Sequence, residues 1–343
     1  MKPKPVNDTR GDTGRFAEDA RFAVEAARWA PSVYNTQPWT FGIGEGRISL
    51  RADADRRLDV ADPDGREMLI SCGAALFNLV LALRYRGYAP RVRLLPEPDR
   101  PHLLADVDVT EPAEGPAGPD VVRLYEQVRE RRTHRGPFRP HQVPAGLLAT
   151  LREEARREGA ALHVITDEHA RAALAALTGA AEHLGRADPA RNAEIIRWAP
   201  PPHSSRPDGV HAEAYPREPE RARPDFPGRD FARGQGWGSD APSGDAARGA
   251  ATGVVVLLTT AADTPADWLR AGQAMQRVLL RAHAEEGLSA AFHTQALEFP
   301  ELREVIRTRL CDGANPQMLL RLGVTDTRYR TVRRPLGELL HQE

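Results

Sequence analysis

One apolar helix constrains the fold of this chain more than any other feature of its sequence. Apolar residues recur at the spacing of a single helix face at Leu69, Cys72, Leu76, Leu79 and Leu83. Between Leu76 and Leu83 the segment is apolar on nearly every face, and Gly87 predicts its end. A helix without a polar side has no face to turn to water, so we expect it inside a hydrophobic core.

A second long helix resembles the first. The segment Gly73-Ala74-Ala75-Leu76 has a counterpart in Gly272-Gln273-Ala274-Met275, and each helix runs on to a glycine. Asp64 and Glu67 have the spacing of a capping box at the start of the first helix, and Thr264 with Pro265 predicts the start of the second. The likeness suggests an internal duplication, although buried helices that end in glycine are common.

The 343 residues suit two domains or one large duplicated unit. We expect a disordered tail over residues 1–14, a first half over 15–119 and a second half over 120–343. Residues 185–249 are rich in Pro and Gly and lack clear periodicity, which is typical of a lid or of disorder. Short strand patterns in both halves predict an α+β fold, at residues 40–43, 47–50, 91–95, 103–109, 162–165, 254–258 and 318–322.

Charge and composition exclude several functions. Lys and Arg number 47 and Asp and Glu 48, so no global field favours nucleic acid or an anionic membrane. The N-terminus lacks the apolar region of a secretory signal and no apolar run is long enough to cross a bilayer, so we expect a cytoplasmic protein. Cys72 and Cys311 have no paired spacing, so neither a disulfide nor a metal site is indicated.

The segment from Pro31 to Trp39 reads Pro-Ser-Val-Tyr-Asn-Thr-Gln-Pro-Trp and follows a helix. Its two prolines stiffen the backbone, and Ser32, Asn35 and Gln37 offer hydroxyl and amide groups at defined places. Such groups suit the edge of an isoalloxazine ring, which carries both acceptors and an N–H. The same residues are also compatible with a turn that only satisfies its own backbone.

Two basic clusters could hold a phosphate. The first contains Arg131, Arg132, Thr133 and Arg135, and guanidinium groups bind phosphate in a bidentate, charge-assisted way. The second, near the C-terminus, contains Arg333 and Arg334 before Pro335. Each cluster taken alone is equally compatible with a solvated basic turn.

Together these three segments resemble the nitroreductase family. Its members carry a Pro-Ser-x-x-Asn-x-Gln-Pro-Trp-like motif, an Arg-Arg-Ser-x-Arg-like motif and a late Arg/Lys-x-Arg-Pro-Leu-like segment. Ordinary members carry the Arg-Arg-Ser motif first, within one short subunit. Here the order is reversed and the chain is long, which resembles the Acg-type proteins, in which two nitroreductase-like halves mimic the usual homodimer. Thr133 in place of Ser keeps the hydroxyl.

The resemblance implies a nitroreductase-like fold of two pseudo-symmetric halves, each a mainly antiparallel sheet flanked by helices, with one FMN per chain. It assigns the phosphate and ribityl chain to Arg131, Arg132, Thr133 and Arg135. It completes the phosphate site with Arg333, with Arg334 as a further candidate. It places near the ring Pro31, Ser32, Asn35 and Gln37. His293 departs from the Acg-type pattern and is compatible with substrate contact or with packing.

We therefore expect an FMN-dependent oxidoreductase that passes two electrons from NAD(P)H to a nitroaromatic, a quinone or a similar small acceptor. No dedicated catalytic residue is indicated, because the flavin carries the chemistry. Two alternatives stay open: an FMN store or sensor with a lid-covered flavin, and a specialised biosynthetic dehydrogenase. The chain would act as a monomeric pseudo-dimer or form a homodimer, without nucleic-acid or membrane partners.

Overall fold

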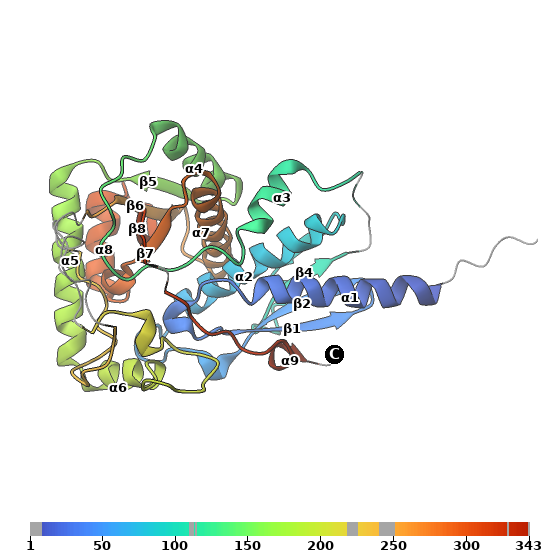
Figure 1. Ribbon diagram of the computed structural model, residues 1–343, viewed down its shortest axis with the longest axis horizontal. Helices are drawn as coiled ribbons and strands as arrows, with labels where there is room; N and C mark the ends of the chain where they lie inside the picture. Colours follow the sequence, from blue (N-terminus) through green and yellow to red (C-terminus); the bar gives the residue numbers. More distant parts are fainter. Residues whose placement is uncertain are drawn as a thin grey trace, which may run out of the picture.

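Two β-sheets lie on either side of a central pair of helices (Figure 1). The computed structural model describes residues 9–109, 113, 115–217, 226–239, 251–327 and 329–341. The first sheet has the strand order β3-β4-β2-β1-β9 and the second the order β5-β6-β8-β7. Every neighbouring pair is antiparallel except β1 with β9. The predicted α+β class is thus confirmed.

The strands occupy most of the segments that the sequence predicts. They are β1 (Trp39–Gly44), β2 (Arg47–Ala52), β3 (Arg91–Leu94), β4 (Leu103–Asp108), β5 (Ala161–Val164), β6 (Val254–Thr260), β7 (Ser289–Phe292), β8 (Asn315–Gly323) and β9 (Leu340–His341). The short strands β7 and β9 have no alternating pattern long enough to be predicted.

Helices connect and flank these strands in both halves of the chain. They are α1 (Thr9–Ala27), α2 (Arg66–Tyr85), α3 (Pro119–Glu126), α4 (Ala145–Arg157), α5 (Glu168–Ala187), α6 (Pro189–Trp198), α7 (Pro265–Glu286), α8 (Pro300–Leu310) and α9 (Leu336–Leu339). Helix α1 begins within the predicted tail, and residues 1–8 lie outside the described residues.

Helices α2 and α7 pack so closely that their backbones touch. A Cβ atom on Gly73 would lie 2.1 Å from the carbonyl oxygen of Leu269, and one on Gly272 would lie 2.0 Å from that of Ile70. Beyond this contact the buried Gln276 side chain donates a hydrogen bond to Asn78 Oδ1 at 2.8 Å. Gly73 and Gly272 hold equivalent positions in the two similar helix sequences, so the two similar segments contact each other at the centre of the molecule.

The two helix starts test the capping predictions. Thr264 and Asp267 form a capping box at the start of α7, and Gly287 ends it at a φ of 62°. The box predicted for α2 is wrong: its N-cap is Gly65, and the side chain of Asp62 accepts hydrogen bonds from the backbone N–H groups of residues 67 and 68. A positive φ of 73° at Gly65 brings Asp62 over the helix end, which sequence spacing does not reveal.

Helix α2 is also long and apolar enough to cross a membrane, by length and composition. All its residues from Arg66 to Leu83 are buried inside the molecule, against α1, α7 and the first sheet. Burial in the core, as the sequence predicts, accounts for its apolar character.

The C-terminal segment returns to the first half. After β8 the chain crosses the molecule, and β9 pairs in parallel with β1, with Phe41 opposite Leu340 (Figure 1). The strands of residues 15–119 and 120–343 therefore form one sheet each, apart from this exchanged end. The predicted domain limits stay a prediction, and the crossing segment ties the halves together.

The described part of the predicted lid is folded. Helix α6 and the coil after it contribute Trp198, Val210, Tyr215 and Phe231 to a small hydrophobic cluster that also contains Tyr34. Residues 218–225 and 240–250 lie outside the described residues. The packing of this segment against the Pro31–Trp39 loop brings it over the site described next.

Candidate functional site

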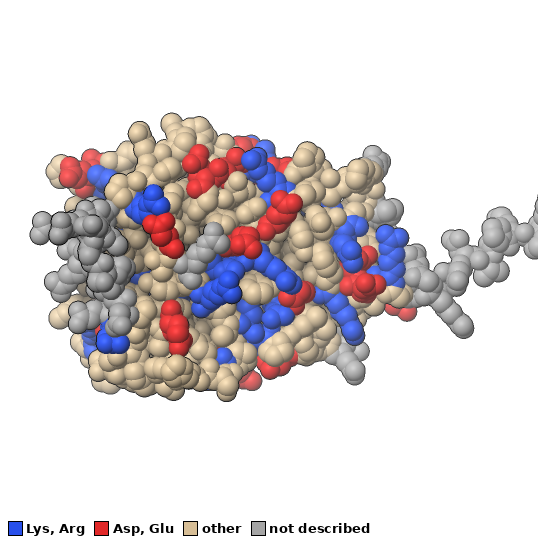
Figure 2. Space-filling model, in the orientation of Figure 1, with Lys and Arg blue, Asp and Glu red and all other residues tan. Residues whose placement is uncertain are grey.

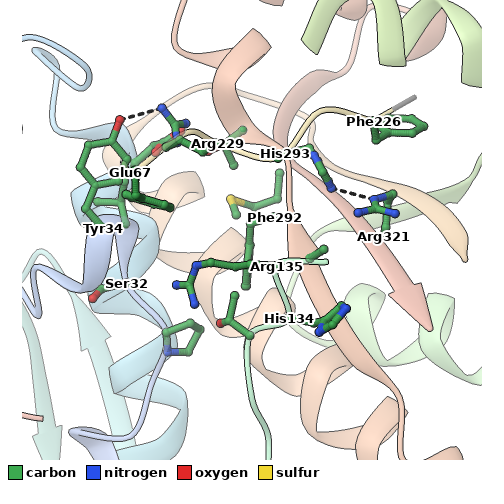
Figure 3. Close-up of a pocket in the computed structure, with 18 of the residues that line it drawn as sticks. Ser32, Tyr34, Glu67, His134, Arg135, Phe226, Arg229, Phe292, His293 and Arg321 are labelled. Atoms are coloured by element: carbon green, nitrogen blue, oxygen red, sulfur yellow. Dashed lines mark hydrogen bonds between the residues drawn. The ribbon is translucent and has the colours of Figure 1, made fainter. Parts of the chain in front are cut away.

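A cavity lies where the two halves meet the lid segment. It contains about 1030 Å³ of empty space, a volume that includes space open to solvent. One wall is Pro31 to Tyr34, a second is Thr133 to Pro137, and the lid contributes Phe226, Arg229 and Phe231. Figure 3 shows these side chains converging from separate elements. Two segments about a hundred residues apart are thus brought together, as the sequence predicts.

The Pro31–Trp39 loop has an unusual backbone. Tyr34, Asn35 and Gln37 have φ values of 47°, 55° and 51°, in a left-handed region that residues other than glycine rarely adopt. Hydrogen bonds hold this conformation: Ser32 Oγ accepts from the N–H of Gln37 at 3.0 Å, and Ser71 Oγ from that of Val33 at 3.1 Å. Strained backbone that its surroundings enforce is typical of functional sites.

The two amides of this loop contact protein. Asn35 Nδ2 donates to the carbonyls of Gly209 and Val332, at 2.9 and 3.1 Å. Gln37 Nε2 donates to the carbonyl of residue 207 at 3.0 Å, and its Oε1 accepts from the backbone N–H of residue 334. Both amides therefore join the loop to the lid and to the C-terminal segment, and neither lines the cavity. Their assignment to the flavin ring stays a prediction.

We expect Asn35→Ala to destabilise the protein by roughly 3–4 kcal/mol, because three buried or partly buried hydrogen bonds are lost and alanine disfavours the left-handed backbone. The matched variant Asn35→Gly loses the same bonds but accepts the backbone, so it should be about 1 kcal/mol less harmful. Urea unfolding followed by circular dichroism measures both. Equal stability of the two variants would contradict the proposed strain.

Two arginines from opposite ends of the second half converge beside this loop. Arg131 Nη2 and Arg333 Nη2 donate to the same carbonyl oxygen, that of Trp29, at 3.3 and 3.4 Å. The Nε and Nη1 atoms of Arg131 and the Nε of Arg333 are buried, with no hydrogen-bond partner in the described part of the chain. Burial and the neighbouring guanidinium groups lower the pKa of both arginines to about 9. An anion is the missing partner that such a cluster demands.

More arginines surround these two. Arg28, Arg129 and Arg132 lie with Arg333 about the indole of Trp29, at 5.6 to 5.9 Å from its centre. On the face shown in Figure 2, basic side chains gather near the middle, where the C-terminal segment crosses. The local field is thus positive although the chain is nearly neutral.

The remaining predicted residues divide into two groups. Pro31, Ser32, Thr133 and Arg135 line the cavity, and Arg135 also donates to the carbonyl of Ala214 in the lid at 3.1 Å. Arg132 lies at the edge of the cluster and donates to the carbonyls of residues 129 and 131.

Arg334 faces away from the other arginines. Its Nη1 donates to the backbone carbonyl of Gln37 at 3.1 Å and approaches Asp53 Oδ2 at 3.4 Å, and its Nε lies 3.5 Å from Glu338. These contacts attach the C-terminal segment to the first sheet.

An ionic network that sequence reasoning missed closes the far end of the cavity. Arg229 of the lid donates to the Tyr34 hydroxyl at 2.7 Å and pairs through both Nη atoms with Glu298. The buried Glu67 carboxyl lies beside them (Figure 3). Tyr34 lies inside the predicted motif, but neither spacing nor composition connects Glu67, Arg229 and Glu298.

Two histidines in the cavity wall are neutral. Burial lowers the pKa of His293 well below its ordinary value, and its Nε2 accepts a hydrogen bond from Arg321 Nε at 2.7 Å. Burial lowers the pKa of His134 to about 4, and its Nε2 donates to the carbonyl of Pro137 at 2.8 Å. His293 is thus a buried wall residue, held by Arg321.

Comparison with models of known protein families gives no match. Individual proteins do match. Rv3131 of Mycobacterium tuberculosis (strain ATCC 25618 / H37Rv), which is named an NAD(P)H nitroreductase, is 34% identical over 311 residues, covering 90% of this chain and 85% of the relative. The chain belongs to the nitroreductase family. The protein acg of the same strain, also named an NAD(P)H nitroreductase, is 29% identical over 96% of this chain and 97% of its own length.

Solved nitroreductases resemble parts of this nitroreductase-family chain. NfnB of Sphigopyxis sp. strain HMH, an FMN- and NADPH-dependent nitroreductase, is 19% identical with a TM-score of 0.40, over 64% of this chain and 98% of its own. A nitroreductase from Desulfovibrio desulfuricans, solved with FMN, is 17% identical with a TM-score of 0.37, over 64% and 96%. A structural similarity this low does not support an argument, so the assignment to the nitroreductase family rests on the sequence match to Rv3131.

Proposed function

We propose that this chain is an FMN-dependent oxidoreductase that passes two electrons from NAD(P)H to a small organic acceptor, such as a nitroaromatic or a quinone. One observation carries the proposal. Arg131 and Arg333 converge on one carbonyl with buried nitrogens that lack partners among the described residues, and Thr133 and Arg135 of the same segment line a cavity. The family membership supports the same reading.

The residues present fit FMN. A phosphate dianion would supply acceptors for the unpartnered nitrogens of Arg131 and Arg333 and would offset their mutual repulsion. Thr133 and Arg135 continue from this cluster into the cavity wall and would hold the ribityl chain. Ser32 would meet the ring, because its oxygen accepts from the N–H of Gln37 and its hydroxyl proton is left to donate.

The flavin supplies the hydride chemistry, and the protein binds and orients it. The loop of residues 31–39 and the arginines of residues 131–135 belong to one chain. We therefore propose that one chain builds the whole site, as a monomer that reproduces the arrangement of the family homodimer.

The purified protein should be yellow and should release FMN, not FAD, on denaturation. Anaerobic mixing with NADH or NADPH should bleach the flavin absorbance in a stopped-flow instrument, and a quinone or a nitroaromatic should restore it. Colourless protein that does not take up added FMN would refute the proposal.

A flavin store or sensor is the second candidate, and the fastened lid favours it. Arg229 joins the lid to Tyr34 of the first half and Glu298 of the second. If this contact shuts the cavity, the wild type should react slowly with NAD(P)H, and Arg229→Gln should raise the bleaching rate about tenfold or more. Fast bleaching of the wild type would exclude the store and leave the oxidoreductase.

A further inference from the structure

We infer that Glu67 is the proton donor to the acceptor substrate, and that it delivers its proton from Oε2 to an oxygen of a quinone or nitro group bound in the cavity. This inference rests on the proposed function and names a catalytic residue for it. Reduction of such an acceptor by two electrons forms new O–H bonds, and an acid held beside the acceptor speeds the proton transfer that they require.

Glu67 is placed to act on a molecule in the cavity. It lies in the first turn of α2, is only 5% exposed, and lines the same cavity as Pro31, Ser32 and Arg135. Arg66 Nη2 donates to Glu67 Oε1 at 3.0 Å, which leaves Oε2 for the proton. Figure 3 shows the side chain beside Tyr34 and Arg229, away from Arg135 and His134.

The surroundings keep this carboxyl protonated near neutral pH. Burial, the Glu298 carboxylate and Asp62 raise the pKa of Glu67 to about 8, against the opposing charges of Arg66 and Arg229. The Tyr34 hydroxyl also interacts with Glu67. The Glu298 carboxyl has different partners, because Arg229 and Arg191 both form ion pairs with it.

The other titratable groups in the cavity wall are not suited to donate a proton near neutral pH. Burial places the pKa of His134 at about 4 and that of His293 lower than its ordinary value, so neither holds a proton to give. Burial raises the pKa of Tyr34 well above 10, and that of Arg135 is about 10. Within the described cavity lining, Glu67 has the pKa closest to neutrality among the groups with a resolved shift, where general acids work best.

The transfer balances as follows. A bound flavin, once reduced by NAD(P)H, would supply the electron pair and one hydrogen as a hydride equivalent. The Oε2–H bond of Glu67 breaks as an O–H bond forms on the acceptor, which leaves a carboxylate beside Arg66. A quinone thereby becomes a hydroquinone, whereas a nitro group also breaks one N–O bond and loses that oxygen as water. A proton from solvent restores the acid before the next turnover.

The test separates the two half-reactions of the holoenzyme. In Glu67→Gln, the rate at which NAD(P)H bleaches the flavin should stay within about twofold of wild type. Reoxidation by benzoquinone should slow about 100-fold, the lower end of general-acid effects. Reoxidation by ferricyanide, which takes electrons without protons, should not change. Glu154→Gln, at a buried carboxyl in α4 paired with Arg277 and Arg281, is the matched control.

A second measurement does not depend on turnover. The infrared band of a protonated carboxyl should be present in the wild type at neutral pH, should disappear as the pH passes about 8, and should be missing in Glu67→Gln. If Glu67→Gln does not fold, Glu67→Asp should shift this band and slow benzoquinone without affecting ferricyanide.

Equal slowing of benzoquinone and ferricyanide, or no slowing of either, would overturn the inference. So would a missing carboxyl band in the wild type. Because flavin binding and bleaching by NAD(P)H are measured in the same samples, these outcomes leave the proposed oxidoreductase standing. Loss of flavin binding or of bleaching in the wild type would instead refute the proposed function.

Discussion

Gly272→Ala is expected to lower the free energy of unfolding by at least about 3 kcal/mol, at the upper end of overpacking effects. The new Cβ would lie 2.0 Å from the Ile70 carbonyl oxygen and 2.9 Å from the backbone nitrogen of Ala74. Both contacts are with backbone, so no side chain can turn aside, and α2 and α7 must separate. Urea unfolding followed by circular dichroism measures the change.

Gly179→Ala is the matched control, because this glycine also lies inside a helix, α5. Its Cβ would approach no atom nearer than the Pro227 side chain, at 3.8 Å, which is ordinary contact. Alanine there should stabilise the protein by up to about 1 kcal/mol through helix propensity. If both variants unfold alike, the close approach of α2 and α7 is not what limits stability.

Separation of the two helices should also damage the site. Helix α2 carries Glu67, Ile70 and Ser71 of the cavity wall, and α7 carries Met275. Gly272→Ala protein that still folds should therefore bind FMN more weakly, which flavin fluorescence would detect.

Arg131→Met is expected to weaken FMN binding about 100-fold and to stabilise the flavin-free protein. Loss of a charge-assisted contact to phosphate costs roughly 2–3 kcal/mol. Its Nη2 donates a hydrogen bond to the Trp29 carbonyl at 3.3 Å, while its Nε and Nη1 are buried without partners among the described residues. An apolar side chain of similar length removes that desolvation penalty and the repulsion from Arg132 and Arg135.

Fluorescence titration with FMN and thermal unfolding of the flavin-free protein measure the two effects. Arg139→Met, at an exposed arginine paired with Asp326, should change neither. A purely structural role for Arg131 predicts that binding and stability fall together. Opposite signs are therefore the distinguishing result.

The sequence predicted elements well where local rules decide them. Thr264, Asp267 and Gly287 fix the ends of α7 because capping depends on neighbours in the chain. The predicted N-cap of α2 was wrong, because Gly65 is the N-cap and its left-handed backbone lets the Asp62 side chain reach the helix end. Strand β9 was not predicted because its two residues gain stability only from pairing with β1.

The same distinction holds at the site. The motifs placed Ser32, Thr133 and Arg135 in one cavity, and they placed Arg131 beside Arg333. Residue type alone could not tell which way each side chain turns. Asn35 and Gln37 are buried in contacts with the lid and the C-terminal segment, and Arg334 contacts the first sheet.

The sequence by itself determined the buried helix pair, the α+β class and the two motifs that meet at the cavity, because periodicity and motif chemistry are local properties of the chain. Only the tertiary structure decided that Glu67 and Arg229 line that cavity and that Glu298 pairs with Arg229, since the three lie on segments far apart in sequence. Burial and mutual charge set the protonation of Glu67, and neither exists until the chain has folded.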